Sequence, residues 1–290
     1  MTILRSTGWP DYALLDTGHG QRLERFGLYT LIRPDPQIIW KPHLFKNSWN
    51  QTDAEFSRTT GDKGIWRYAT NVPSSWLMRY KSLSFFCKCT PFKHTGVFPE
   101  QQPHWDFIME TVANAPKSVH VLNLFGYTGI ATLAAASAGA KVTHVDASRS
   151  AIRWARENQN ASELSHAPIR WILDDAISFV RREGTRGATY DAIIMDPPVY
   201  GHGPDGQRWS FNESFLELLT LCRSVLSSHP LFVIVNAYAI SSSSIMLKNS
   251  TEEILGELGG TITYGELALQ EHKSDRLLST GIFSRWQSSE

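Results

Sequence analysis

The chain has 290 residues, of which 42% are hydrophobic and 19% are charged, so it can bury a sizeable core and is not globally disordered. Its 28 basic and 28 acidic side chains balance, and no run of Lys or Arg resembles a nucleic-acid-binding tail. Three cysteines are too few for a disulfide framework, and the first ten residues lack the apolar segment of a signal peptide, so we expect a cytoplasmic protein.

The charges are unevenly distributed along the chain. Residues 1–98 contain 13 Lys and Arg against 7 Asp and Glu, whereas residues 99–290 contain 15 against 21. A basic first part joined to an acidic second part is consistent with RNA as a partner. Residues 119–140 carry no charge, but Asn123, Gly126 and Gly129 interrupt them, which favours a strand, a turn and a helix over a membrane span.

Residues 1–94 are predicted to form a small β-rich N-terminal domain with a possible role in substrate recognition. The segments 29–33, 65–70 and 82–89 are rich in aromatic and β-branched residues, and Gly, Pro, Asp and Asn separate them. Their strand order is left open.

Residues 95–290 are predicted to form the larger domain, because strands alternate with helices from about Ser118 onward. We expect an α/β fold built on a Rossmann-like, mostly parallel sheet of seven strands. The predicted strands are 119–125, 141–147, 169–173, 190–195, 231–237, 260–269 and 279–286, and the predicted helices are 130–139, 148–160, 175–184, 211–227 and 250–258.

In such a sheet, ligands bind beyond the carboxyl ends of the strands, so the residues that follow each strand are candidate site residues. The first strand leads into a turn with Gly126 and Gly129, which either brings the backbone close to a ligand or only makes a tight turn. The second strand ends in Asp146, which either accepts the hydroxyl groups of a ribose or caps the helix near Ser148.

The third and fourth strands also end in acids. Asp174 or Asp175, followed by the amide of Ala176, can read an adenine or can cap a helix. The fourth strand ends in Asp196, Pro197 and Pro198, a rigid corner that suits a substrate clamp.

The loop that follows this corner, residues 201–209, contains four Gly and Pro residues and ends in Arg208 and Trp209. It is either a mobile lid with His202 as a proton acceptor or a surface loop with a solvent-facing histidine.

This series of strand ends resembles class I S-adenosyl-L-methionine (SAM)-dependent methyltransferases. The segments HTGVFPEQ, LNLFGYTG and DPPVYGHGPDGQRW look more closely like the bacterial branch that contains large-subunit ribosomal-RNA methyltransferases for cytosine carbon-5 or guanine. The resemblance covers about residues 94–290. It implies a SAM cofactor, S-adenosyl-L-homocysteine as product, no metal, RNA as the partner, no membrane association and a possible homo-oligomer.

The resemblance also implies roles for individual residues. Those around the methionine end of SAM would be Phe98, Gln101, Asn123, Phe125, Gly126, Thr128 and Gly129. Those near the ribose and the adenine would be Asp146, Ala147, Asp175 and Ala176. Asp196 would lie between cofactor and substrate, and Pro197, Pro198 and Tyr200 would complete the catalytic set, with Tyr200 stacking on the base.

The expected target atom is a nitrogen of an RNA base. Carbon-5 of cytosine needs a cysteine thiolate for activation, and neither the fifth strand nor the Asp-Pro-Pro loop is followed by a cysteine. Cys87, Cys89 and Cys222 are interpreted as structural thiols. Two alternatives stay open from the sequence: a methyltransferase for a protein or small molecule, and a non-catalytic SAM-binding module.

Overall fold

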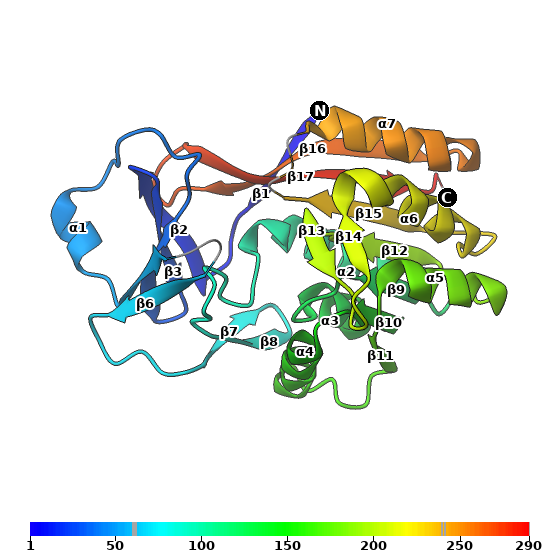
Figure 1. Cartoon of the computed structure of the whole chain (residues 1–290), viewed down its shortest axis with the longest axis horizontal. Helices are drawn as coiled ribbons and strands as arrows, with labels where there is room; N and C mark the ends of the chain where they lie inside the picture. Colours follow the sequence, from blue (N-terminus) through cyan, green and yellow to red (C-terminus); the bar gives the residue numbers. More distant parts are fainter. Residues whose placement is uncertain (60–62, 239, 241, 290) are drawn as a thin grey trace. The chain divides into compact units, whose positions relative to one another are not determined.

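The computed structural model of the protein describes residues 1–59, 63–238, 240 and 242–289. The chain divides into two compact units (Figure 1). The first contains residues 1–4, 100–268 and 279–290, and the second contains residues 5–99 and 269–278. The predicted division into two domains at residues 94 and 95 stays a prediction.

The first unit is built on one eight-stranded sheet. In spatial order its strands are β1 (Thr2–Ser6), β16 (Thr261–Gln270), β17 (Leu277–Gln287), β15 (Phe232–Ala237), β12 (Ala192–Met195), β9 (His120–Leu124), β10 (Lys141–Asp146) and β11 (Ile169–Leu173). The four pairs from β15 to β11 are parallel, and β17 is antiparallel to β15. The predicted α/β fold with its mostly parallel sheet is therefore confirmed.

The eighth strand, β1, pairs with the edge of the seven predicted strands. It was not predicted, because residues 2–6 have no turn or hydrophobic pattern that marks them as a strand of this sheet. Gly265 of β16 permits this pairing, since a Cβ atom at this position would collide with the backbone of Thr2.

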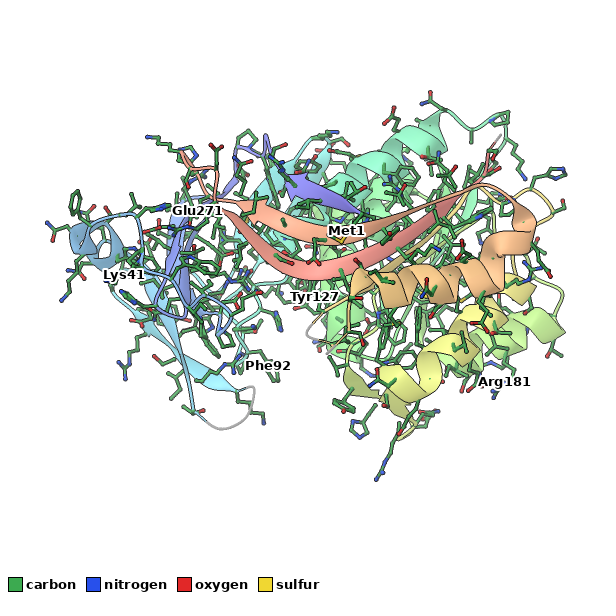
Figure 2. All side chains as sticks on the ribbon, turned by 90° about the horizontal axis from the view of Figure 1, so that it is seen from above. Met1, Lys41, Phe92, Tyr127, Arg181 and Glu271 are labelled. Carbon is green, nitrogen blue, oxygen red and sulfur yellow. The ribbon has the colours of Figure 1, made fainter. Side chains whose placement is uncertain are left out.

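Two layers of helices cover the sheet (Figures 1 and 2). Helices α2, α3 and α4 pack together on one face, and α5, α6 and α7 pack on the other. Their bounds are α2 (Gln102–Ala113), α3 (Ile130–Ser137), α4 (Arg149–Ala161), α5 (Ala176–Thr185), α6 (Phe211–Ser224) and α7 (Ser244–Leu255), and two short turns are η1 (Pro99–Gln101) and η2 (Gly256–Leu258). Such a doubly wound sheet is buried on both faces, which explains its continuous apolar strands.

Two helices differ from the prediction. Helix α2 was not predicted, although Trp105, Ile108 and Val112 recur at helical spacing and are buried. Helix α7 begins at Ser244, six residues before the predicted start, because Leu247 extends its buried face. None of the described helices combines the length and hydropathy that a membrane span requires.

The second unit is β-rich, as predicted. A five-stranded sheet has the order β2 (Tyr12–Gly18), β3 (Gln21–Phe26), β4 (Tyr29–Pro34), β5 (Ala54–Arg58) and β6 (Gly64–Tyr68), and a separate hairpin is formed by β7 (Trp76–Tyr80) and β8 (Leu83–Cys87). A short helix, α1 (Lys46–Asn50), lies between β4 and β5.

A charged pair stabilises the core of this second unit. Glu24 is completely buried and accepts two hydrogen bonds of 2.7 Å from the Arg33 guanidinium group. The Tyr12 hydroxyl group donates a third bond, of 2.8 Å. Burial opposes ionisation, but Arg33 and Arg22 lower the pKa of Glu24, so the carboxyl group remains charged inside the core.

Candidate functional site

The candidate site lies at the carboxyl ends of four neighbouring parallel strands. In the register of the sheet, Leu124 at the end of β9 pairs with Val145 of β10 and with Met195 of β12, and Asp146 pairs with Leu173 of β11. The chain runs outward from β9 to β11 and then crosses to β12, so the strand order reverses beside β9. Ligands of doubly wound sheets bind at such a reversal. Apart from Gln101, which lies in η1, the predicted site residues in the first unit lie at or shortly after the ends of these strands.

The turn after β9 has an unusual backbone. Phe125 and Tyr127 adopt positive φ angles of 56° and 49°, which cost energy for residues with a side chain. Hydrogen bonds hold this turn: the Gly126 N–H donates to the Val145 carbonyl at 3.1 Å, and the Gly129 N–H donates to the Gly126 carbonyl at 2.9 Å. The turn is thus fixed before any ligand arrives.

Packing inside the protein requires the two glycines of this turn. A Cβ atom at Gly126 would collide with the His144 ring of β10, and one at Gly129 would lie 2.9 Å from the Cβ atom of Ala155. Gly129 also has a φ angle of 84°, which favours glycine. From the sequence, the two glycines indicated only a close approach to a ligand or a tight turn, and the contact between Gly126 and His144 was not predicted.

Asn123 and Thr128 support the turn from below. The Asn123 amide donates to the Thr132 hydroxyl group at 2.9 Å, and that hydroxyl group lies 2.9 Å from Nδ1 of His144. Burial lowers the pKa of His144 to about 3, so this ring is neutral. Asn158 donates to the Thr128 carbonyl at 2.9 Å. The side chain of Asn123 is therefore occupied within the core.

Asp146 joins the turn to the next strand. One carboxylate oxygen accepts a bond of 2.8 Å from the Tyr127 N–H, and the other accepts a bond of 2.7 Å from the Ser148 N–H. Burial raises the pKa of Asp146, and these two N–H groups act in the opposite direction. The cap of helix α4 is Ser148 itself, since its hydroxyl group accepts from the Ala151 N–H. Each Asp146 oxygen keeps lone pairs for further donors.

Asp175 is the N-cap of helix α5. Its Oδ1 atom accepts a bond of 2.9 Å from the Ser178 N–H, so the capping alternative accounts for one of its two oxygens. The preceding Asp174 forms an ion pair with Arg182. Ala176 is buried at the first position of the helix.

Asp196 lies at the end of β12 in a small polar cluster. Gln101 donates to Asp196 Oδ2 at 2.7 Å and to the Tyr238 hydroxyl oxygen at 2.9 Å. Asp196 Oδ1 is buried and has no hydrogen-bond partner among the described residues. Burial raises the pKa of Asp196 to about 7; the Gln101 bond lowers it and the Glu100 carboxyl group raises it. A buried oxygen without a donor is costly, and it suits a ligand that brings an N–H or O–H group.

The two prolines after Asp196 differ in exposure and bonding. Pro197 is buried, whereas Pro198 is exposed and its carbonyl accepts a bond of 2.6 Å from the Trp209 indole. The Trp209 ring also lies 5.0 Å from the ring of Phe125. This contact places an aromatic wall between the glycine turn and the Asp-Pro-Pro corner.

The loop predicted as a lid or a surface loop forms a β-hairpin. Its strands are β13 (Tyr200–His202) and β14 (Arg208–Ser210). Trp209 is buried on one face, while Tyr200, 75% exposed, and His202 lie on the opposite face. The Tyr200 ring is free to stack on a planar ligand, which leaves its predicted role open.

Two groups of predicted residues lie elsewhere. Phe98 belongs to the second unit, where its ring lies 5.2 Å from that of His94. Cys222 is buried in the last turn of helix α6, and burial raises the pKa of its thiol. Burial likewise raises the pKa of Cys87 and, to about 11, that of Cys89. All three thiols are protonated at neutral pH, so none is a ready nucleophile.

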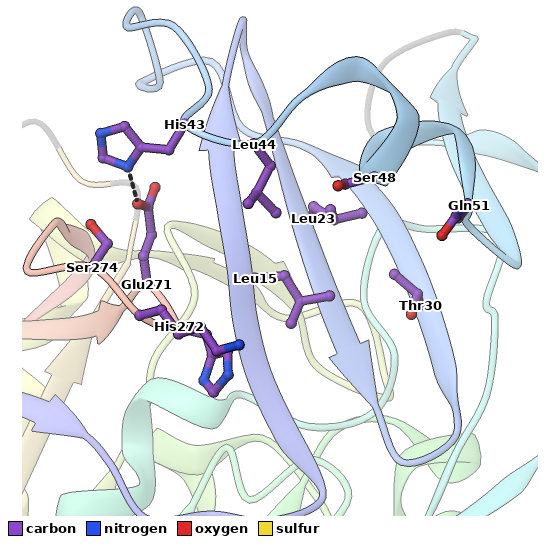
Figure 3. Close-up of a pocket in the computed structure, with 11 residues that line it drawn as sticks. Leu15, Leu23, Thr30, His43, Leu44, Ser48, Gln51, Glu271, His272 and Ser274 are labelled. Carbon is purple, nitrogen blue, oxygen red and sulfur yellow. Dashed lines mark hydrogen bonds and ion pairs between the residues drawn. The ribbon is translucent and has the colours of Figure 1, made fainter.

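The second unit contains a separate pocket of about 560 Å³ (Figure 3). Leu15, Leu23 and Leu44 form an apolar part of its wall, and His43 and Glu271 lie at one side, where they are 3.1 Å apart. It contains no residue of the predicted site.

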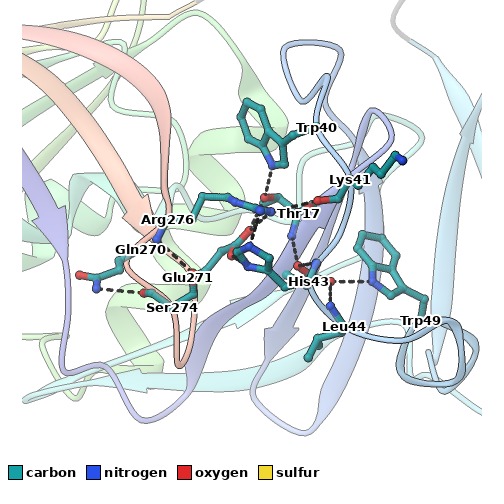
Figure 4. A network of polar contacts seen from close by, with 11 residues as sticks. Thr17, Trp40, Lys41, His43, Leu44, Trp49, Gln270, Glu271, Ser274 and Arg276 are labelled. Carbon is teal, nitrogen blue, oxygen red and sulfur yellow. Dashed lines mark hydrogen bonds and ion pairs between the residues drawn. The ribbon is translucent and has the colours of Figure 1, made fainter.

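A polar network closes that side of the pocket (Figure 4). Asp16, His43 and Glu271 lie close enough for their ligand atoms to fall within 4.8 Å of one another. The Asp16 carboxylate, however, accepts four hydrogen bonds, which come from Thr17 N, His43 N, Leu44 N and the Trp49 indole. Glu271 accepts from Thr17 and Arg276. These contacts use the carboxylate lone pairs and bring in a guanidinium charge, so we interpret the network as a support for the loop around His43.

Known proteins resemble parts of this chain. Residues 101–204 match the family model described as Conserved hypothetical protein 95. Two curated relatives are each named Ribosomal RNA large subunit methyltransferase K/L. That of Syntrophotalea carbinolica is 35% identical over 117 residues, which is 40% of this chain and 15% of the relative. That of Alteromonas mediterranea is 28% identical over 183 residues, which is 60% of this chain and 25% of the relative. The chain thus spans a quarter or less of these two proteins.

One solved structure covers nearly the whole chain. The SAM-dependent methyltransferase from Agrobacterium tumefaciens is 41% identical, with a TM-score of 0.96, over 99% of this chain and 93% of that protein. Both units of the chain are therefore shared with it. This chain belongs to the family of SAM-dependent methyltransferases, and SAM is its cofactor.

Proposed function

We propose that this methyltransferase modifies a base in RNA and that the methylated atom is an exocyclic nitrogen. The names of its curated relatives, which are ribosomal-RNA methyltransferases, support an RNA substrate. The single observation that carries the nitrogen target is the buried Asp196 Oδ1 atom, which has no donor among the described residues. A base amine has two hydrogens to donate, and a carboxylate oxygen that accepts one of them turns the nitrogen lone pair toward an electrophile.

The residues at the strand ends fit a bound SAM molecule. Asp146 offers lone pairs on both carboxylate oxygens at the end of β10, as two ribose hydroxyl groups require. The glycine turn and Phe125 border the same edge of the sheet as Asp196. SAM supplies the electrophilic methyl group on its sulfonium. The protein has to hold the accepting nitrogen in line with that group, and positioning of this kind provides much of the catalysis.

The state of the thiols supports nitrogen over carbon-5 as the target. Activation of cytosine carbon-5 requires a thiolate beside the base. Cys222 is enclosed in a helix and burial raises the pKa of its thiol, so it does not provide one. An amine acceptor needs no thiolate, because its nitrogen is already nucleophilic once a hydrogen-bond acceptor orients it.

The test is transfer of a labelled methyl group to ribosomal RNA isolated from a strain in which the gene is deleted. We expect the wild-type protein to label this RNA and not RNA from the parent strain, whose sites are already methylated. Nucleoside mass spectrometry then identifies the modified base and atom. Label that appears in protein or in small molecules would contradict the RNA substrate, and 5-methylcytosine would contradict the nitrogen target.

A further inference from the structure

We propose that Tyr238 is a positioning residue for methyl transfer: together with Gln101 it fixes the Asp196 carboxyl group so that Oδ1 faces the amine of the substrate. This inference rests on the proposed role of Asp196. Tyr238 follows the end of β15, the strand next to β12, and it was not among the site residues predicted from the sequence.

The Gln101 amide has two acceptors for its two hydrogens. Its Nε2 atom lies 2.7 Å from Asp196 Oδ2 and 2.9 Å from the Tyr238 hydroxyl oxygen. A single acceptor would leave the amide plane free to rotate, whereas two acceptors in different directions define it. Because the Gln101 amide is fixed, Asp196 Oδ2, which accepts from it, is fixed as well. The orientation of Asp196 Oδ1 is then defined too.

The Tyr238 ring is itself held in place by a glycine of β17. A Cβ atom at Gly281 would lie 2.7 Å from Cε1 of the Tyr238 ring and 3.1 Å from the Ala237 carbonyl oxygen. The ring therefore lies against the backbone of β17 at a position where any side chain would displace it. This gives a continuous series of contacts from Gly281 through Tyr238 and Gln101 to Asp196.

The chemistry of the phenol fits positioning rather than proton transfer. Burial, and then the Asp196 and Glu100 carboxyl groups, raise the pKa of Tyr238 well above its usual value. The group is therefore an uncharged hydroxyl at neutral pH. A hydroxyl group both accepts and donates, so it can accept from Gln101 without becoming a base or a nucleophile.

The test compares Tyr238→Phe with the wild-type protein, and uses ribosomal RNA from the deletion strain and labelled SAM. We expect kcat to fall about fivefold to tenfold, the effect of one hydrogen bond, while the calorimetric Kd for SAM stays unchanged. The hydrogen bond from Gln101 lowers the pKa of Asp196, so a weaker bond in Tyr238→Phe should leave that pKa higher. The acid limb of the pH profile should therefore move to higher pH. The titratable groups that act on Asp196 in the described structure are Glu100 and Tyr238.

Tyr190→Phe is the matched control. The Tyr190 hydroxyl group is buried and donates to the Glu183 carboxylate at 2.6 Å. Tyr190 precedes β12, however, and so lies at the opposite end of this strand from Asp196. We expect this variant to lose stability without any change in the pH profile. Gly281→Ala is the second variant, and it should reproduce the kcat and pH effects of Tyr238→Phe by displacing the ring.

A readout without turnover completes the test. Carboxyl ¹³C chemical shifts of the free protein, assigned with Asp196→Asn, should show a higher midpoint for Asp196 in Tyr238→Phe than in wild type and Tyr190→Phe. An identical midpoint and an identical kcat in Tyr238→Phe would overturn the inference. If wild-type protein labels no RNA but the midpoint moves as expected, the proposed substrate is wrong and the positioning role stands.

Discussion

Gln101 and Asp196 are 95 positions apart in the sequence, and their side chains are joined by a hydrogen bond of 2.7 Å beside the carboxyl end of β12. This bond satisfies one carboxylate oxygen and leaves the other buried without a partner among the described residues. The described part of the protein therefore keeps a buried acceptor that an N–H or O–H group of a ligand can satisfy. Functional sites commonly retain such locally unfavourable groups.

The rate of methyl transfer should depend on the protonation of Asp196. Burial raises its pKa to about 7, and only the ionised carboxylate accepts hydrogens on both oxygens. We expect kcat/KM to rise with pH through about 7 and to reach a plateau near pH 8, with a loss of about tenfold per pH unit well below the pKa. Initial rates measured from pH 5.5 to 8.5 test this.

Asp196→Asn is the control for the pH profile. It keeps one oxygen for Gln101 but cannot ionise, so the remaining activity should be low and independent of pH in this range. A wild-type profile that is flat across pH 7 would assign the acceptor role to a different group.

The same variant should make the folded protein more stable at high pH. The folded-state pKa of Asp196 is raised, so its contribution to stability is fully present below the unfolded-state pKa and is lost as the pH rises through about 7. Removal of the buried charge in Asp196→Asn should therefore increase the free energy of unfolding at pH 8 by roughly 1–3 kcal/mol, and by less at pH 5. Denaturant unfolding at the two pH values measures the difference.

Asp191 provides a control of opposite sign just before the same strand. Burial opposes its ionisation, but bonds from Lys117, His120 and Ser227 lower the pKa of Asp191. Its contribution is present above the unfolded-state pKa and is lost as the pH falls through the lower folded-state value. Asp191→Asn should therefore destabilise the protein at pH 8.

A loss of stability in Asp196→Asn at pH 8 would contradict the prediction for Asp196, because it would show that the buried Asp196 carboxylate does not destabilise the folded protein.

The alternation of strands and helices along the chain, and the acids that follow the strands, could be predicted from the sequence, because both depend on local patterns. The partners of those acids could not. Gln101 is brought to Asp196 by the fold, and Tyr238 follows a different strand. Gly126 was visible as a turn residue, but His144 beneath it was not, since the contact depends on how β9 and β10 pair. Helix α2 was not predicted, although its buried residues recur at helical spacing.

SAM affinity should depend on Asp146. Its two carboxylate oxygens already accept from the Tyr127 and Ser148 amides, and each keeps a lone pair that a ribose hydroxyl group can use. Asp146→Ala should weaken SAM binding tenfold or more, which corresponds to at least about 1.4 kcal/mol. Isothermal titration calorimetry measures the SAM affinity, with Asp191→Asn, at the opposite end of the parallel strands, as a control. Equal SAM affinities of Asp146→Ala and wild type would exclude Asp146 from the cofactor site.

Asp175 allows capping and cofactor binding to be separated. Asparagine caps helices as well as aspartate does, so Asp175→Asn should keep the bond to the Ser178 N–H and the stability of helix α5. Its amide then presents N–H groups instead of an acceptor to the adenine amine, and we expect about a tenfold loss of SAM affinity. Asp175→Ala should lose both the helix cap and the SAM affinity. Normal SAM affinity in Asp175→Asn would limit this residue to capping.

The contact between Gly126 and His144 should be measurable as a coupling energy. A methyl group at Gly126 collides with the buried ring, so Gly126→Ala should destabilise the protein by roughly 1–3 kcal/mol. His144→Ala alone leaves a cavity and also costs stability, but the double variant gives the new methyl group space. We therefore expect the double variant to be more stable than the sum of the single effects predicts, by about 1 kcal/mol. Thermal unfolding of the four proteins completes the cycle. Strict additivity would mean that the glycine is required by the backbone of the turn or by the cofactor, and not by the histidine.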